Sequence, residues 1–209
     1  MGRCFEEIDD KVREFITAQP LFFVATAPLA VSGHVNLSPK GLDTLRILGP
    51  KAVAYLDHVG SGAETIAHLR ENGRIALMFC SFEGSPKIFR LYGTGRAIES
   101  HDTDFAGLSK LFSKLAGART IVHVTVDRIA ESCGFGVPCY TYQGQRPLLE
   151  DWVERKGGAG LLAYQRDKNA TSIDGLPTLR WLERESSSST TAAMNGAGIV
   201  EEPEDADEL

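Results

Sequence analysis

Apolar residues recur along this chain at spacings that change from helical to strand-like. An amphipathic helix is predicted first, and Pro20 ends it; its apolar face carries Phe5, Ile8, Val12, Phe15 and Ile16. Short apolar or alternating runs follow, and these are typical of β-strands. We predict strands at residues 21–26, 34–38, 45–48, 52–56, 75–82, 87–98 and 120–127.

Four further helices are predicted, two between these strands and two after the last of them. Glu64 stands three residues after Ser61, which is the capping-box spacing, so a helix is predicted from Ser61 to Asn72. Further helices are predicted at residues 102–115, 146–152 and 160–164.

The number and order of these elements predict the fold class. Six or seven short strands with few helices indicate a mainly β protein with flanking helices, built around a small barrel. Strands and helices do not alternate regularly, which disfavours a Rossmann fold. Pro39 cannot donate a ladder hydrogen bond, so the strand at 34–38 is predicted to end there or to lie at a sheet edge.

Charge is distributed unevenly along the 209 residues. Of 28 acidic residues, seven lie in Glu185–Leu209, which has no Lys or Arg. The rest of the chain therefore has 21 acidic and 22 basic residues, a formal net charge of +1. A nearly neutral folded part predicts no nucleic-acid partner, and the Ser-rich, acidic end is typical of disorder. No apolar run reaches the ~20 residues of a membrane span. The polar, acidic N-terminus does not resemble a secretory signal, so we expect a cytoplasmic protein.

The cysteines do not predict a metal site. Cys4, Cys80, Cys133 and Cys139 form no CxxC pair and have no partnering His spacing, so no metal is expected. In a cytoplasmic protein we expect them as thiols.

Small residues before the helix at 61–72 suggest an anion site. Gly60, Ser61 and Gly62 leave backbone N–H groups accessible at the positive end of the helix dipole, where a phosphate can bind. Ser61 as a simple helix cap is the alternative. Lys40, just beyond a predicted strand, can supply a point charge, and an exposed lysine is its alternative.

Other polar residues can complete such a site. Asn36 and Ser38 share one face of their strand, so both can reach one ligand. His58 ends the strand before the helix and could stack on or hydrogen-bond a ligand; an exposed loop histidine is the alternative. Arg90 lies within a predicted strand, where it either faces a ligand or is solvated.

Six segments, in this order, resemble the pyridoxamine 5′-phosphate oxidase-like superfamily of flavin-binding split barrels. They read FFVATAP (22–28), GHVNLSPKG (33–41), AVAYLDH (52–58), KIFRLYGTG (87–95), ESCGFGVP (131–138) and DKNATSIDGLP (167–177), and the capped helix predicted at 61–72 lies between the third and the fourth. The last two resemble one uncharacterised branch of that superfamily.

The resemblance implies an FMN-binding split β-barrel over residues 1–183, with a C-terminal extension and a disordered acidic tail at 184–209. It implies a homodimer whose flavin mediates two-electron transfer with an unknown small-molecule substrate, and so an oxidoreductase. The implied FMN site takes Asn36, Ser38, Lys40, His58, Gly60, Ser61, Gly62 and Arg90. A non-enzymatic flavin-binding or sensing module is the alternative, as is the same fold with a deazaflavin or haem.

The chain departs from this family pattern at two places. Characterised oxidases carry an Arg-Lys pair after the serine, where this chain has Gly62-Ala63, so Lys40 or Arg90 would have to compensate. The Arg/His set that holds the substrate in true pyridoxamine phosphate oxidases is not found here. The resemblance therefore supports flavin binding and not oxidation of pyridoxamine 5′-phosphate.

Overall fold

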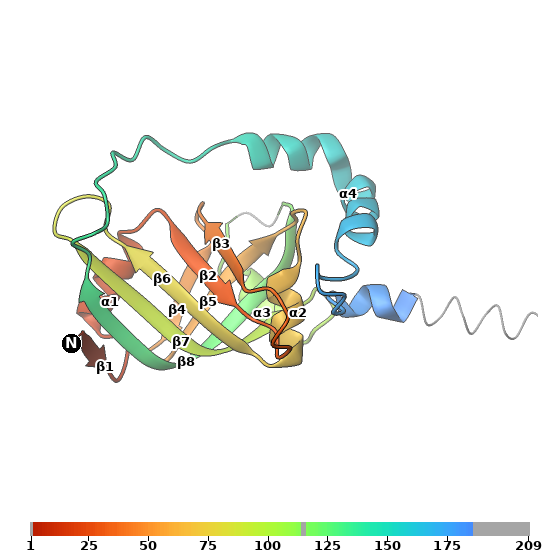
Figure 1. Ribbon diagram of the computed structural model, residues 1–209. Coiled ribbons are helices and arrows are strands. Elements are labelled where there is room, and N and C mark those ends of the chain that lie inside the picture. The colour runs from red at the N-terminus through yellow and green to blue at the C-terminus, as the bar shows by residue number, and fades with distance from the viewer. Residues whose placement is uncertain (1, 114–115, 186–209) are drawn as a thin grey trace, which may run out of the picture.

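The computed structural model describes residues 2–113 and 116–185 and consists mainly of one antiparallel sheet (Figure 1). The strands of the described part are β1 (Arg3–Phe5), β2 (Phe22–Thr26), β3 (Asn36–Lys40), β4 (Leu45–Gly49), β5 (Ala52–His58), β6 (Arg74–Cys80), β7 (Lys87–Ile98) and β8 (Ala118–Cys133). Its helices are α1 (Asp10–Thr17), α2 (Glu64–Glu71), α3 (Phe105–Ser109) and α4 (Leu148–Lys168).

The sheet curls into a barrel that is open along one seam. Its strand order is β3-β2-β6-β7-β8-β5-β4, and β1 pairs with β8 beside this path. The two terminal strands, β3 and β4, do not pair with each other, and this unpaired border is the seam. The predicted fold class, mainly β with flanking helices in a split barrel, is confirmed.

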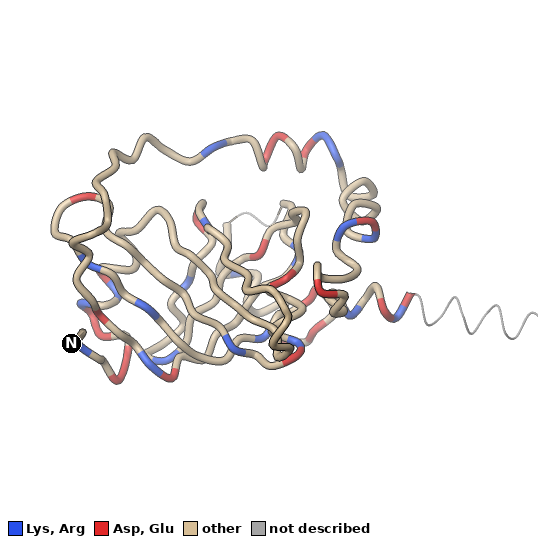
Figure 2. Tube along the Cα trace, viewed as in Figure 1, with Lys and Arg blue, Asp and Glu red and all other residues tan. Residues whose placement is uncertain are grey.

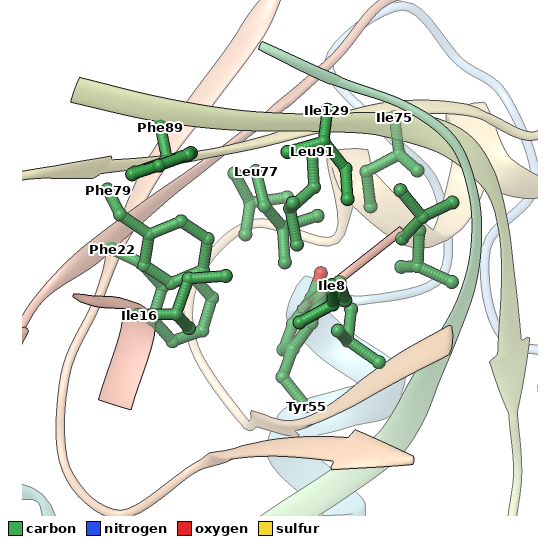
Figure 3. Packing of buried hydrophobic residues seen from close by; sticks show 14 of the residues in the cluster. Ile8, Ile16, Phe22, Tyr55, Ile75, Leu77, Phe79, Phe89, Leu91 and Ile129 are labelled. Atoms are coloured by element: carbon green, nitrogen blue, oxygen red, sulfur yellow. The ribbon is translucent and has the colours of Figure 1, made fainter. Parts of the chain in front are cut away.

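Alternating side chains fill the barrel. Ile75, Leu77 and Phe79 of β6 are buried in one cluster with Phe89 and Leu91 of β7 (Figure 3). Such alternation places every second side chain inside, as expected for a sheet with one buried face. The rings of Phe22 and Phe79 lie 5.6 Å apart and stack within this core. The strands therefore form where the sequence alternates.

Pro39 lies in an edge strand, as predicted. β3 pairs only with β2 in the described sheet, with Pro39 opposite Phe23. An edge strand tolerates a residue that lacks an N–H because one side of the strand makes no ladder bonds.

Three predicted helices differ from the observed ones. α1 begins at Asp10 and not near Phe5, because Asp9 caps it by accepting a hydrogen bond from the Val12 N–H at 2.8 Å. Residues 3–5 instead form β1. The helix predicted at 102–115 is shortened to α3, Phe105–Ser109; residues 114–115 lie outside the described part.

The predicted helix cap at Ser61 is wrong. α2 begins at Glu64, and its N-cap residue is Ala63, which has no side-chain acceptor. Ser61 lies two residues earlier and is exposed. Because Glu64 is the first helical residue, its carboxylate cannot close a capping box and instead accepts a hydrogen bond from the Ile173 N–H at 3.1 Å.

A long C-terminal segment leaves the barrel and returns to it. Residues 134–147, here called the strap, run from the end of β8 above the barrel to α4 (Figure 1). α4 is divided at Gly157 (φ 61°, ψ 172°), so its two pieces correspond to the two helical stretches predicted from sequence. Residues 180–185 are helical and include the first two residues of the predicted disordered tail at 184–209; residues 186–209 lie outside the described part.

Candidate functional site

The seam contains a polar cavity because β4 is shorter than β5. β4 pairs with β5 between Ala52 and Tyr55, so Asp57 and His58 extend beyond it. There they meet the polar face of β3 and the turn before α2. The cavity has a volume of about 290 Å³, and we call it the seam cavity. Among its lining residues are seven predicted from sequence: Asn36, Ser38, Lys40, His58, Gly60, Ser61 and Gly62.

Two cations share one buried carboxylate at the seam cavity. The Lys40 Nζ lies 2.8 Å from Asp57 Oδ1. Arg119 donates from Nε and Nη2 to Asp57 Oδ2 at 3.0 and 2.8 Å. The Asp57 side chain is 1% exposed and that of Arg119 is 4% exposed, whereas Lys40 is 21% exposed. Lys40 is therefore the cation that meets the solvent.

A β-bulge directs Arg119 toward this cavity. Asp57 pairs with Thr120 and His58 pairs with Ala118, so Arg119 is an extra residue in β8 without a partner in β5. A bulge of this kind changes the direction in which a side chain points. Arg119 Nη1 also donates to the Gly62 carbonyl oxygen at 2.9 Å. One guanidinium thus ties the turn before α2 to the carboxylate of β5.

The charges around Asp57 determine its protonation state. Burial by itself would raise the pKa of this carboxyl, but the Arg119 and Lys40 charges outweigh burial and hold the pKa well below its usual range. Asp57 is therefore ionised at neutral pH. Burial lowers the pKa of His58, so its imidazole is neutral there and has one donor and one acceptor nitrogen.

Hydrogen bonds connect β3 to the start of α2. Asn36 Nδ2 donates to Thr65 Oγ1 at 3.0 Å, and Ser38 Oγ donates to Asn36 Oδ1 at 3.3 Å. The first bond within α2 runs from the Ala67 N–H to the Ala63 carbonyl at 3.1 Å. The N–H groups of the preceding turn therefore have no acceptor within the helix. These bonds fix the polar face of β3 beside the dipole end of α2.

The C-terminal segment reaches the same turn from the other side. Asn169, just after α4, is fully buried and donates from Nδ2 to the Gly60 carbonyl at 2.9 Å. The Ile173 N–H is bound by Glu64, the first residue of α2. The DKNATSIDGLP segment, whose role the sequence does not reveal, thus supports the Gly60–Gly62 turn.

Arg90 is the predicted site residue that the structure places elsewhere. It lies in β7 opposite Met78 and Ala130, and its Nη1 donates to Ser132 Oγ at 2.9 Å. Ser132 is near the end of β8 that is opposite to Arg119, because β8 runs from Ala118 to Cys133. Arg90 therefore does not line the seam cavity.

Sequence reasoning missed Arg119 and Asp57 as site residues. A carboxylate that ends the apolar run AVAYLDH was a usable signal, because a buried acid needs cationic partners. The bulge that directs Arg119 inward has no such signal, since it depends on the register between two strands. Arg119 thus brings a second cation to the seam cavity from β8.

The described residues hold no group of three or more His, Cys, Asp or Glu side chains able to bind a metal ion. All four cysteines are free thiols in the structure. Among the described helices, none combines the length and the apolar character needed to cross a membrane.

Comparison with known proteins assigns the chain to a family. Residues 8–133 match the family profile described as pyridoxamine 5′-phosphate oxidase. The pyridoxamine 5′-phosphate oxidase family protein ustO of Aspergillus flavus is 42% identical over 195 residues, which are 84% of this chain and 77% of that protein.

Solved structures share the fold. A single-residue variant of HupZ from Group A Streptococcus matches with a TM-score of 0.50 at 22% identity, over 60% of this chain and 99% of that chain. An FMN-binding protein from Syntrophomonas wolfei has a TM-score of 0.45 at 18% identity, over 58% of this chain and 84% of that chain. The profile covers more than half of this chain, and the chain belongs to the pyridoxamine 5′-phosphate oxidase family.

Proposed function

We propose that this protein binds FMN at the seam cavity and uses it for two-electron transfer with a small-molecule substrate. The observation that carries the proposal is the partly exposed Lys40 beside the Arg119–Asp57 pair, at the N-terminal end of α2. A phosphate monoester matches this set of donors, because it needs positive charge and several N–H or O–H groups at once. Membership of the pyridoxamine 5′-phosphate oxidase family supports a flavin as the molecule that carries this phosphate.

The donor set fits a phosphate group on three counts. Lys40 has ammonium hydrogens beyond the one directed at Asp57. Gly60 leaves open space where a Cβ would stand, so a ligand can approach its backbone. Thr120 Oγ1 is buried without a hydrogen-bond partner among the described residues, on the strand face that also carries Asp57. Thr120 does not itself line the seam cavity but is the β8 partner of Asp57, which does, and an unpartnered buried hydroxyl is a donor that a ligand can use.

Two carboxylates at the cavity are already engaged. Asp57 lies behind the two cations, and Glu64 accepts the Ile173 N–H. Ligand charge is therefore met first by Lys40 and by the N–H groups at the start of α2. When bound, FMN would supply the two-electron chemistry itself. Asn36, Ser38 and neutral His58 would orient it through hydrogen bonds.

Non-enzymatic flavin binding is the second candidate. It is favoured by one observation: Asp57 and Glu64, the carboxylates that line the seam cavity, are both engaged by other groups of the protein, which leaves neutral His58 as the acid or base candidate among the described lining residues. Stopped-flow oxidation of the reduced, flavin-loaded protein with candidate acceptors separates the two. Turnover supports the oxidoreductase, and stoichiometric reoxidation without turnover supports a binding module.

We also propose a homodimer, with the second copy over the β3 edge. β3 is a terminal strand, and a row of apolar side chains on and before it is exposed: Leu29, Val31, Val35 and Leu37. An unpaired edge with apolar side chains favours association. Sedimentation equilibrium should give twice the chain mass, and Val35→Lys should yield monomers. A monomeric parent protein would refute the dimer.

Titration of apo-protein tests the cofactor. FMN should bind more tightly than riboflavin, which lacks the phosphate, and FAD should not displace it, because the proposal places one set of phosphate donors at the seam cavity. Absorbance of the purified protein identifies the bound species, since flavin, deazaflavin and haem have different spectra. Tight FAD binding without FMN affinity, or a Soret band, would overturn the proposal.

A further inference from the structure

A second, larger cavity lies between the strap and the barrel. Its volume is about 910 Å³, within the range of roughly 300–1,000 Å³ that is usual for small-molecule sites. Phe23 and Phe82 contribute from the barrel side, and Tyr140, Tyr142 and Leu148 contribute from the strap and the start of α4. We call it the strap cavity.

We propose that the strap cavity binds a planar aromatic anion, such as an aromatic carboxylate. We also propose that such anions are the substrates of the protein, and this second statement rests on the proposed flavin function. The site itself does not depend on FMN, so the two proposals can fail separately.

The walls of the strap cavity suit a planar aromatic ligand. The Phe82 and Tyr140 rings lie 5.7 Å apart, at an interplanar angle of 36°. Tyr140 is 63% exposed and Tyr142 is 52% exposed, although both border a cavity with apolar walls. Aromatic rings left in water beside apolar walls gain contact area and favourable ring–ring geometry when a flat ligand enters.

Charge at the rim favours an anion. Residues 134–145 carry no charged side chain, and Arg146 follows them at the edge of the strap cavity (Figure 2). Arg146 is exposed and has no ion-pair or hydrogen-bond partner among the described residues. The acid at this cavity, Glu83, already accepts the Tyr142 N–H at 2.9 Å through Oε1. A ligand carboxylate would therefore meet a guanidinium that is still available.

Three hydrogen bonds hold the strap in place over the barrel. The Tyr140 N–H donates to the Phe82 carbonyl at 3.0 Å, and the Tyr142 N–H donates to Glu83 Oε1. Gln145 Nε2 donates to the Pro20 carbonyl at 3.2 Å. These contacts join the strap to two separate parts of the barrel, the β6–β7 connection and Pro20 before β2, so the cavity walls have a defined position.

The strap cavity adjoins the seam cavity along the chain. Lys40 lines the seam cavity, and the next residue, Gly41, lines the strap cavity. Gln145 Oε1 lies 2.9 Å from the position a Cβ would take at Gly41, so the strap comes close to the end of β3. A ligand in the strap cavity would thus lie next to a phosphate-bearing cofactor in the seam cavity.

Two fluorescent probes test the site. The anion 8-anilino-1-naphthalenesulfonate and the neutral N-phenyl-1-naphthylamine share one aromatic framework and differ in the sulfonate. Both should bind the wild-type protein. Tyr142→Ser keeps the backbone bond to Glu83 but removes the ring, and should weaken both probes about two- to tenfold. Arg146→Gln should weaken only the anion, by about two- to fivefold, because the guanidinium is exposed.

Matched variants outside the cavity serve as controls. Tyr92→Ser removes an exposed ring from β7, and Arg155→Gln removes an exposed arginine from α4; neither should change either affinity. FMN titration of the same variants should be unaffected. Equal weakening by Tyr142→Ser and Tyr92→Ser, loss of both probes in Arg146→Gln, or no binding to the wild type would overturn the strap site. Failure of FMN to bind would leave the probe result standing.

Discussion

The inward faces of β5 and β8 change from apolar to charged within two residues. Tyr55 pairs with Val122 inside the apolar core, and the next inward pair is Asp57 with Thr120. The apolar end depends on packing, whereas the polar end depends on two cations that neutralise one buried carboxylate. The difference shows that one strand can contribute both to the apolar core and to the site, provided that cations from other elements neutralise its carboxylate.

Asp57→Asn should have the largest effect, because it leaves Arg119 buried and Lys40 partly buried without their carboxylate. Removing one partner of a buried ion pair costs about 3–5 kcal/mol, so the free energy of unfolding measured in urea should fall by about this amount. Lys51→Gln, at an exposed lysine in the turn before β5, is the control and should change nothing.

The same variant has a pH signature. The folded-state pKa of Asp57 is depressed, so its contribution to stability is fully present above the unfolded value of about 3.9 and is lost as the pH falls below it. The stability gap between wild type and Asp57→Asn should be constant from pH 5 to 8 and should shrink below about pH 4. A gap that stays constant at low pH would mean that the carboxylate is not charge-stabilised.

Leu77→Ala tests the apolar end of the comparison. Leu77 is fully buried in the barrel cluster, and truncation of a core leucine costs about 2–5 kcal/mol. The loss should not depend on pH, because no charged group is affected, and flavin affinity should be retained. Loss of flavin affinity with the fold intact would show that core and site are not separable.

The sequence predicted the apolar end of this comparison better than the polar end. The short apolar run that holds Leu77 and the alternating run that holds Val122 both predicted strands. The cavity residues of β3 and the turn before α2 were also found, because motifs keep them close in sequence. Arg119 was missed because a bulge in strand register directs it. Arg90 does not line the seam cavity, and a strand position alone does not tell which end of the barrel a residue faces.

Thr120→Val should extend the apolar end of β8 by one residue and stabilise the fold. It replaces a buried hydroxyl that has no partner among the described residues by a methyl group of similar shape. An unsatisfied buried polar group costs about 1–3 kcal/mol, so the variant should be more stable by up to about 1 kcal/mol. Thermal unfolding measures this, and weaker FMN binding should accompany it if the hydroxyl serves the ligand. A destabilised variant would imply that the hydroxyl already has a partner.

Ser61→Ala should have the smallest effect on stability. Ala63, and not Ser61, is the N-cap residue of α2, so no cap is removed. The free energy of unfolding should change by less than about 0.5 kcal/mol, as for other exposed sites. A loss near the ~1 kcal/mol of a true cap would contradict the observed start of α2.

The central claim is that Lys40 and its partners bind the phosphate of FMN, and the affinities of FMN and riboflavin for Lys40→Gln test it most directly. A charge-assisted hydrogen bond contributes about 1.5–3 kcal/mol, so FMN should bind roughly ten- to a hundredfold more weakly. Riboflavin, without a phosphate, should bind almost as it does to the wild type, and Lys51→Gln should leave both ligands unchanged. Equal losses for FMN and riboflavin in Lys40→Gln would place this lysine away from the phosphate and contradict the account.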